Sequence, residues 1–111
     1  MNVLFICSRN QWRSPTAEQV FRRYPSLAVR SAGTSRNAKK TVSHDLLQWA
    51  DAICVMEQKH KNRLMAEYGR ILEFKPLYVL DIPDDYLFMD PDLVAILEDI
   101  VPSTLGLTES Q

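Results

Sequence analysis

The sequence predicts an α/β fold: a single three-layer domain with a four-stranded parallel sheet and helices on both faces. Short apolar runs rich in Val, Ile and Leu alternate with segments whose apolar residues recur at helical spacing. The connections between them are short, and this alternation is typical of parallel strands joined by helices. We therefore expect residues 1–111 to form one domain, with a frayed tail from about residue 103 to residue 111.

The first strand and the helix after it are marked by clear signals. Val3 to Ile6 is a continuous apolar run, as expected of a strand that is buried on both faces. Ser14 supplies a helix N-cap, and Pro15 follows as a proline at the first helical position. Pro25 ends the helix. The sequence thus places a strand end and a helix start close together.

The next segments continue the alternation. Leu27 to Ser31 is predicted to be the second strand. Residues 35–45 are polar and basic, and we expect a loop there that leads into a short helix around Leu46 to Ala50. Ala52 to Met56, another apolar run, is predicted to be the third strand.

Two helices and a fourth strand complete the expected order. Gln58 to Tyr68 is predicted to be helical, with Gly69 as the residue that ends the helix. Ile71 to Phe74 is expected to be the fourth, shorter strand. The last helix opens on an Asp-Pro pair at residues 90–91, and its apolar residues recur at helical spacing: Leu93, Ile96, Leu97, Ile100 and Val101.

Composition limits the class of protein. Hydrophobic residues make up 46% of the chain and charged residues 24%, a balance that excludes a disordered chain. No apolar run approaches the roughly 18–20 residues that span a bilayer. The opening MNVLFIC lacks the basic region of a secretion signal, so we expect a strand there. Cys7 and Cys54 both sit in apolar runs, which favours free thiols, Cys54 in the core, and a cytoplasmic location without membrane binding.

Charge is divided unevenly along the chain. The net charge is −1, yet all 13 Lys and Arg residues lie in residues 1–75. The charged residues in 76–111 are all Asp or Glu. Two interpretations fit: an anion-binding part followed by a part that supplies carboxylates, or two solvated faces of opposite sign. The basic residues lack interleaved aromatic residues and any nucleic-acid-binding motif, so we expect no nucleic acid as a partner.

The segment from Cys7 to Arg13 carries the main chemical signal. Ligands of parallel sheets bind beyond the carboxyl ends of the strands, where Cys7 is expected. Inward-turned N–H groups of the loop, the start of the helix and the Arg13 guanidinium would favour a thiolate and hold a phosphoryl group. This arrangement predicts metal-independent hydrolysis of a phosphate monoester through a phosphocysteine, without a cofactor. The alternative is a buried cysteine at the end of a strand.

The acidic segment DIPDDY, residues 81–86, offers a proton donor. It follows an apolar segment, so we expect it at the same edge of the sheet as Cys7. A leaving alkoxide or phenoxide needs a proton, which a carboxylic acid can supply. The alternative is an ordinary acidic turn around Pro83.

These motifs together resemble the low-molecular-weight protein tyrosine phosphatase family, of which this chain is a short variant. The resemblance rests on four stretches in the family's order: CSRNQWRSPTAE, VRSAGT, WADAICVMEQKHKNRL and LDIPDDY. It implies a protein tyrosine phosphatase-like hydrolase that acts on a phosphorylated protein or a small phosphate ester, with phosphotyrosine as the foremost substrate.

The resemblance also implies roles for single residues. Cys7 would be the nucleophile, Arg13 would clamp the transition state, and Asp84 would be the general acid and then the general base. Asp81 is the second choice for that acid. The substrate-binding residues would lie in the loop and at the helix start: Ser8, Arg9, Asn10, Gln11, Trp12 and Ser14. Among them Ser14 would donate a hydrogen bond to the thiolate, and Asn10 would hold a left-handed turn.

The chain departs from the family's pattern at three positions. Arg9 stands where the family usually has glycine, Trp12 replaces a cysteine, and Asp85 replaces a proline. The segment between Gly33 and Trp49 is short, which predicts an open pocket. A phosphate- or phosphoprotein-binding module with little turnover is therefore the alternative function.

The sequence also predicts where the side chains of one tryptophan and the two histidines lie. Trp12 either walls a substrate pocket or packs against its own loop. His44 and His60 lack metal-ligand partners at suitable spacing, and we expect both at the surface.

Overall fold

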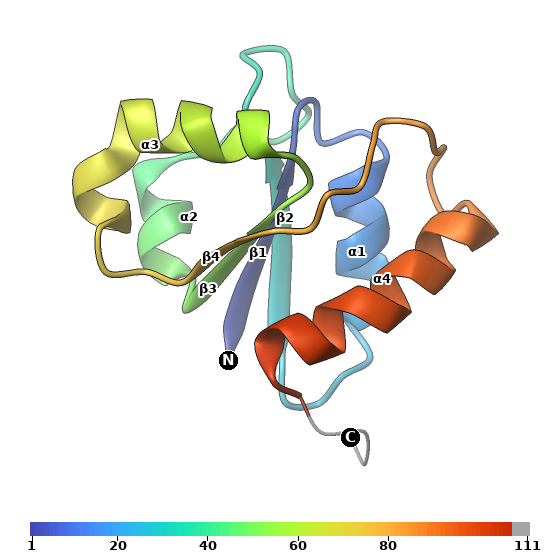
Figure 1. Ribbon diagram of the computed structural model, residues 1–111. Helices are drawn as coiled ribbons and strands as arrows, with labels where there is room; N and C mark the ends of the chain where they lie inside the picture. Colours follow the sequence, from blue (N-terminus) through green and yellow to red (C-terminus); the bar gives the residue numbers. More distant parts are fainter. Residues whose placement is uncertain (108–111) are drawn as a thin grey trace.

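A computed structural model, which describes residues 1–107, confirms the predicted fold class. A four-stranded, all-parallel sheet in the order β2-β1-β3-β4 lies between two pairs of helices (Figure 1). The strands are β1 (Asn2–Cys7), β2 (Ala28–Gly33), β3 (Ala52–Val55) and β4 (Leu77–Val79). The helices are α1 (Arg13–Phe21), α2 (His44–Trp49), α3 (Gln58–Leu72) and α4 (Pro91–Leu105). Within residues 1–107, no helix has both the length and the apolar run needed to cross a membrane.

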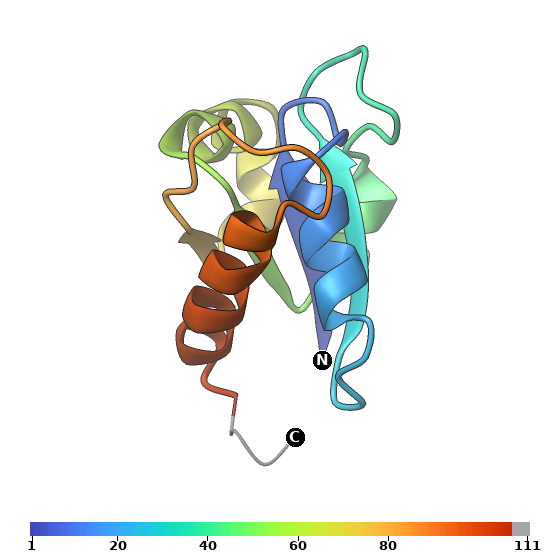
Figure 2. The ribbon, with the colours of Figure 1, turned by 90° about the vertical axis from the view of Figure 1, so that its right-hand side faces the viewer.

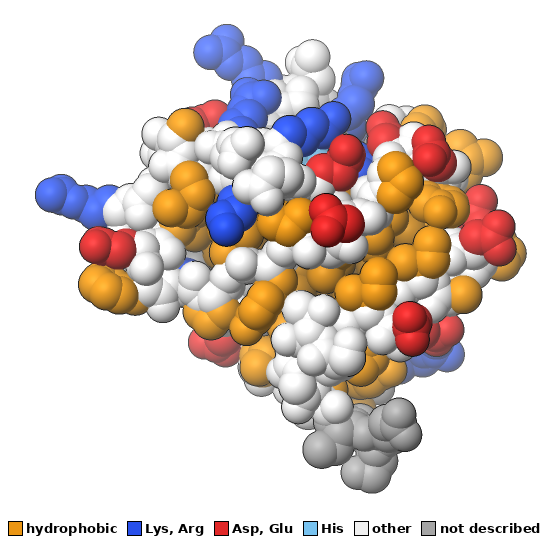
Figure 3. All heavy atoms as spheres, in the orientation of Figure 1, with side chains coloured by type: hydrophobic (Ala, Val, Ile, Leu, Met, Phe, Trp, Pro, Cys, Tyr) orange, Lys and Arg blue, Asp and Glu red, His pale blue; other side chains and the backbone are white. Residues whose placement is uncertain are grey.

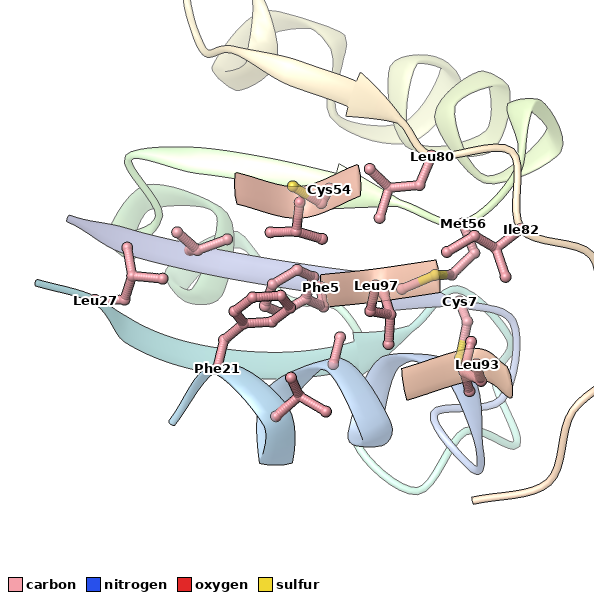
Figure 4. Packing of buried hydrophobic residues seen from close by; sticks show 14 residues of the cluster. Phe5, Cys7, Phe21, Leu27, Cys54, Met56, Leu80, Ile82, Leu93 and Leu97 are labelled. Carbon is pink, nitrogen blue, oxygen red and sulfur yellow. The ribbon is translucent and has the colours of Figure 1, made fainter. Parts of the chain in front are cut away.

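The strands place alternate side chains in two hydrophobic layers. Val3, Phe5 and Cys7 face α1 and α4, whereas Leu4 and Ile6 face α2 and α3. Figure 2 shows α1 and α4 side by side over one face of the sheet. Figure 4 shows the first layer, in which the rings of Phe5 and Phe21 stack with centroids 5.8 Å apart. Burial on both faces explains why β1 is an uninterrupted apolar run.

The strand order positions the site. From β1 the chain moves outward to β2 on one side and then returns to β3 on the other. The loops after β1 and β3 therefore diverge at the carboxyl end of β1, which is where open α/β sheets bind ligands. Cys7, the last residue of β1, lies at this point.

The predicted start of the first helix is wrong by two residues. The helix begins at Arg13, its N-cap is Trp12, and no side chain caps it. Ser14 is not the cap because its hydroxyl lies inside the site, 3.0 Å from Cys7 Sγ. Pro15 is the third helical residue instead of the first, and the helix accommodates it because first-turn N–H groups have no partner within the helix.

The predicted fourth strand at Ile71 to Phe74 is also wrong. Helix α3 runs on through Gly69 to Leu72, with non-helical backbone angles only at Tyr68, and the fourth strand is Leu77–Val79. Leu72 is buried with Leu64 because the apolar stripe of α3 continues past the glycine. Gly69 therefore lies inside the helix and does not end it.

The last helix begins as predicted and ends later than predicted. The Asp90 side chain accepts a hydrogen bond from the N–H of Asp92 (2.8 Å), and Pro91 is the first helical residue. The helix ends at Leu105, and its C-cap is Gly106, whose φ of 70° is left-handed. Residues 103–105 are therefore helical and not frayed, and residues 108–111 of the expected tail lie outside the described residues.

Gly33 lets the end of β2 approach the loop that follows Cys7. A Cβ atom at this position would lie 2.5 Å from the carbonyl oxygen of Ser8 and 2.9 Å from the N atom of Asn10. Both are backbone atoms and cannot move without moving the loop. We expect Gly33→Ala to lower the free energy of unfolding by about 1–3 kcal/mol and to weaken binding of inorganic phosphate.

Gly69→Ala is the matched control for this prediction. A Cβ there meets no atom within 4 Å, and the residue is helical. We expect this variant to gain up to about 1 kcal/mol of stability and to bind phosphate as the wild type does. Urea denaturation and calorimetric titration measure the two properties. Equal stability of the two variants would contradict the proposed crowding at Gly33.

Candidate active site

The loop of residues 8–12, here called the Cys7 loop, turns sharply after β1. Asn10 has φ of 53°, a left-handed conformation that asparagine tolerates. Its amide donates hydrogen bonds to Ser14 Oγ (3.0 Å) and Ser31 Oγ (2.9 Å), and its side chain is buried. Asn10 thus ties the turn to both α1 and β2.

Cys7 lines a small pocket. Its Sγ atom is 3.0 Å from Ser14 Oγ, and the residue is buried. Ser14 Oγ accepts a hydrogen bond from Asn10, and its own O–H can donate either to the sulfur or to the carbonyl oxygen of Ala32, which is 3.4 Å away. The pocket has a volume of about 30 Å³, enough for a group of a few atoms, and is lined by Cys7, Ser8, Arg9, Gln11, Trp12, Arg13 and Asp84.

Arg13 is a buried cation that joins three parts of the chain. Its Nη1 atom donates to Glu57 Oε2 (2.6 Å) and to the carbonyl oxygen of Ile82 (2.7 Å). Its Nε atom is 3.6 Å from Asp84 Oδ1. Within residues 1–107, Nη2 makes no hydrogen bond, so it can bind an oxygen of a ligand in the pocket.

Glu57 is a site residue that the sequence analysis missed. Burial raises the pKa of its carboxyl, but the hydrogen bond and positive charge of Arg13 outweigh this and hold the pKa below its usual value. The pair compensates the buried guanidinium and fixes its orientation. The available signal was the position of Glu57 just after the third strand, at the same sheet edge as Cys7.

Asp84 and Asp81 occupy different places. Asp84 lines the pocket with Cys7, and its side chain is 55% exposed, so water can reach its carboxyl group. Asp81 has φ of 57° and lies in a separate depression with Glu57 and Lys59. Asp84, and not Asp81, therefore lines the pocket that contains Cys7.

The prediction that His60 lies at the surface is wrong. Its side chain is buried, 1% exposed, in the first turn of α3. The imidazole contacts Ser8 Oγ through Nε2 (2.8 Å) and the N–H of Glu57 through Nδ1 (3.0 Å). Burial and then the charge of Arg13 lower its pKa to about 4, so the ring is neutral at neutral pH. His44 is exposed, as predicted.

Cys54 is a core residue, as predicted. It is completely buried in β3 (Figure 4), and burial raises the pKa of its thiol to about 12. It is therefore a protonated thiol at neutral pH. Within residues 1–107, no three His, Cys, Asp or Glu side chains gather in a way that could hold a metal ion.

The surroundings of the pocket are basic and partly aromatic. Arg9 is exposed, and its carbonyl oxygen accepts from the N–H of Lys39 (3.1 Å). Trp12 lines both the pocket and a groove of about 380 Å³ that Pro15 and Phe88 also line, which favours the first of its two alternatives, a wall of the pocket. Figure 3 shows several Lys and Arg side chains at the top of the view and acidic side chains on the side of α4. The basic and acidic residues, which are separated along the sequence, are thus also partly separated on the surface.

The fold and the pocket define a class: α/β proteins with a Cys-x5-Arg loop at the switch point of a parallel sheet. The model of the family "Low molecular weight phosphotyrosine protein phosphatase" matches residues 2–48, which contain β1, the loop, α1 and β2. This match covers less than half of the chain, and it agrees with the family resemblance that the sequence motifs indicate.

Three relatives illustrate the likeness. A protein-arginine-phosphatase of Bacillus subtilis (strain 168) is 28% identical over 63% of this chain, and the match spans 65% of that relative, less than two thirds of its length. The tyrosine phosphatase Wzb of Escherichia coli K30 in complex with phosphate superposes with a TM-score of 0.77 at 21% identity, over 96% of this chain and 98% of that one. YwlE arginine phosphatase, a cysteine-to-serine mutant with a phosphorylated active-site serine, has a TM-score of 0.67 at 22% identity, over 95% and 91%. The two structures share the fold.

Proposed function

We propose that this chain is a cysteine-dependent phosphatase of one domain that hydrolyses phosphate monoesters, foremost phosphotyrosine in proteins, through a phosphocysteine. One observation carries the proposal: Cys7, Arg13 and Asp84 line the same small pocket at the carboxyl end of β1. The three residues have the chemistry of a nucleophile, an anion clamp and an acid. The match to the family model supports the same class of reaction.

In the first step the Cys7 thiolate attacks phosphorus. The S–P bond forms while the bond from phosphorus to the leaving oxygen breaks, and that oxygen takes both electrons. Asp84 in its acid form gives it a proton. Arg13 and the N–H groups of the Cys7 loop stabilise the charge on the other phosphoryl oxygens, where positioning and electrostatics supply most of the catalysis.

In the second step Asp84, now a carboxylate, takes a proton from water as the water oxygen attacks phosphorus. The S–P bond breaks and its electrons return to sulfur. Ser14 donates a hydrogen bond to the thiolate that re-forms, since Ser14 Oγ lies 3.0 Å from the sulfur. Inorganic phosphate leaves, and the enzyme is restored without any cofactor.

Trapping the intermediate tests the proposal. We expect the protein to hydrolyse p-nitrophenyl phosphate in the presence of EDTA. Acid quenching during turnover should leave one phosphoryl group on the peptide that contains Cys7, detected by mass spectrometry, because phosphocysteine forms before water attacks. Binding of inorganic phosphate with no turnover would instead assign the phosphate-binding module.

Phosphoarginine is a second candidate substrate, since the Bacillus relative is a protein-arginine-phosphatase. Its leaving nitrogen would also take a proton from Asp84. Peptides that carry phosphotyrosine or phosphoarginine in the same sequence separate the two. We expect the higher kcat/KM for phosphotyrosine, and the reverse order would assign the arginine phosphatase activity.

A further inference from the structure

The N-terminal end of α3 holds both sides of the Cys7 loop. Glu57, the N-cap of α3, binds Arg13 just after the loop, and His60 binds Ser8 at its start. Figure 1 shows the N-terminal end of α3 beside the loop that follows β1. The proposed mechanism uses Arg13 directly, but it gives no role to the buried His60.

The hydrogen bonds of His60 fix the position of its proton. The backbone N–H of Glu57 can only donate, so Nδ1 must be the unprotonated acceptor. The neutral ring then carries its proton on Nε2, and Nε2–H donates to Ser8 Oγ at 2.8 Å. The direction of the bond follows from the backbone contact on the other side of the ring.

This direction has a consequence for the Ser8 hydroxyl. A hydroxyl oxygen that accepts a hydrogen bond from the imidazole N–H can still donate its own O–H to another acceptor. Among the described residues, Ser8 Oγ has no second hydrogen-bond partner, and Ser8 lines the pocket with Cys7 and Arg13. A phosphoryl oxygen in that pocket is a suitable acceptor.

We propose that His60 is a positioning residue that holds the Ser8 hydroxyl as a donor to the phosphoryl group bound in the Cys7 loop. This inference rests on the proposed function, because it concerns the same pocket. Protonation of Nδ1 would break the bond from Glu57, and a carboxylate in place of the ring would reverse the bond to Ser8. The pair Ser8–His60 thus makes the loop a better phosphate site only while the ring donates.

Two substitutions of His60 separate this role from a structural one. Both Gln and Glu at the third helical position can accept from the Glu57 N–H, as in a capping box. Only the Gln amide can also donate to Ser8. In His60→Glu the carboxylate accepts a hydrogen bond from the Ser8 hydroxyl. The Ser8 O–H then points to the carboxylate and no longer donates into the pocket.

The experiment measures the Kd of inorganic phosphate by calorimetry for both variants, with and without Ser8→Ala. We expect His60→Gln to bind phosphate about as the wild type does, and His60→Glu to bind about tenfold more weakly. In the Ser8→Ala background the two substitutions should give equal Kd values. Thermal unfolding of all variants checks that each is folded.

Two results would overturn the inference. A Gln–Glu difference that persists without the Ser8 hydroxyl would show that the added charge acts directly on phosphate. Equal Kd values with Ser8 present would show that the bond direction is immaterial. Because the readout is phosphate binding, a wild-type protein that binds phosphate without turnover would defeat the proposed function and leave this comparison intact.

Discussion

Replacing Cys7 with serine is expected to lower kcat for p-nitrophenyl phosphate by about 10⁴-fold or more, as removal of a covalent nucleophile does. The serine hydroxyl fits the same space beside Ser14, so the pocket and its phosphate affinity should survive. What is lost is the sulfur atom, which attacks phosphorus and leaves it again more easily than a hydroxyl oxygen does. Steady-state hydrolysis and phosphate titration measure the two properties.

Cys54→Ala is the matched control for Cys7→Ser. Cys54 is buried in β3, and its thiol stays protonated because burial raises its pKa to about 12. The variant should lose some stability through the small cavity and retain kcat. Iodoacetate should label Cys7 in the native wild type, and inorganic phosphate should protect it. Full activity of Cys7→Ser would remove the basis for a phosphocysteine mechanism.

The part of the site that is local in sequence could be predicted, and the structure assembles it. Cys7 and Arg13 are six residues apart, joined by one turn between a strand and a helix. The apolar run of β1 and the helical spacing after it place that turn at the edge of the sheet. Geometry set by neighbouring residues is visible in a sequence pattern.

The supporting contacts could not be predicted because the fold brings them together. Glu57 is 44 residues from Arg13, and His60 is 52 residues from Ser8. In the sequence, EQKH reads as the polar start of a helix. The helix start faces the loop only because the chain returns from β2 across the sheet to β3, which pairs with β1.

The misplaced fourth strand has a similar cause. Ile71 and Leu72 continue the apolar stripe of α3, but the glycine before them suggested that the helix had ended. Glycine in a helix costs roughly 1 kcal/mol, which burial of Leu72 against β1 and β3 side chains offsets. Tertiary packing therefore makes residues 71–72 helical, although the preceding glycine suggested that the helix had ended.

Replacing Asp84 with asparagine is expected to give a loss that depends on the leaving group. For an alkyl phosphate, kcat/KM should fall by about 10²–10⁴-fold, because the alkoxide needs a proton as it leaves. For p-nitrophenyl phosphate it should fall by less than about tenfold, because that phenoxide leaves without help. The ratio kcat/KM reports the steps up to phosphocysteine formation, where the acid acts.

The kcat of the Asp84→Asn variant carries separate information. Hydrolysis of the phosphocysteine needs a base for water, so kcat should fall for both substrates, and phosphocysteine should accumulate during turnover. Weaker binding cannot explain the loss, since removing a negative charge 3.6 Å from Arg13 favours a phosphate dianion.

Asp81→Asn is the control that separates the two candidate acids. Asp81 has left-handed backbone angles that asparagine also adopts, so the loop should keep its shape. Its place beside Glu57 and Lys59 is outside the pocket of Cys7. We expect Asp81→Asn to leave the dependence on the leaving group unchanged. Loss of the proton donor makes kcat/KM depend steeply on the basicity of the leaving oxygen. If Asp81→Asn showed this steep dependence and Asp84→Asn did not, the role of the acid would pass to Asp81.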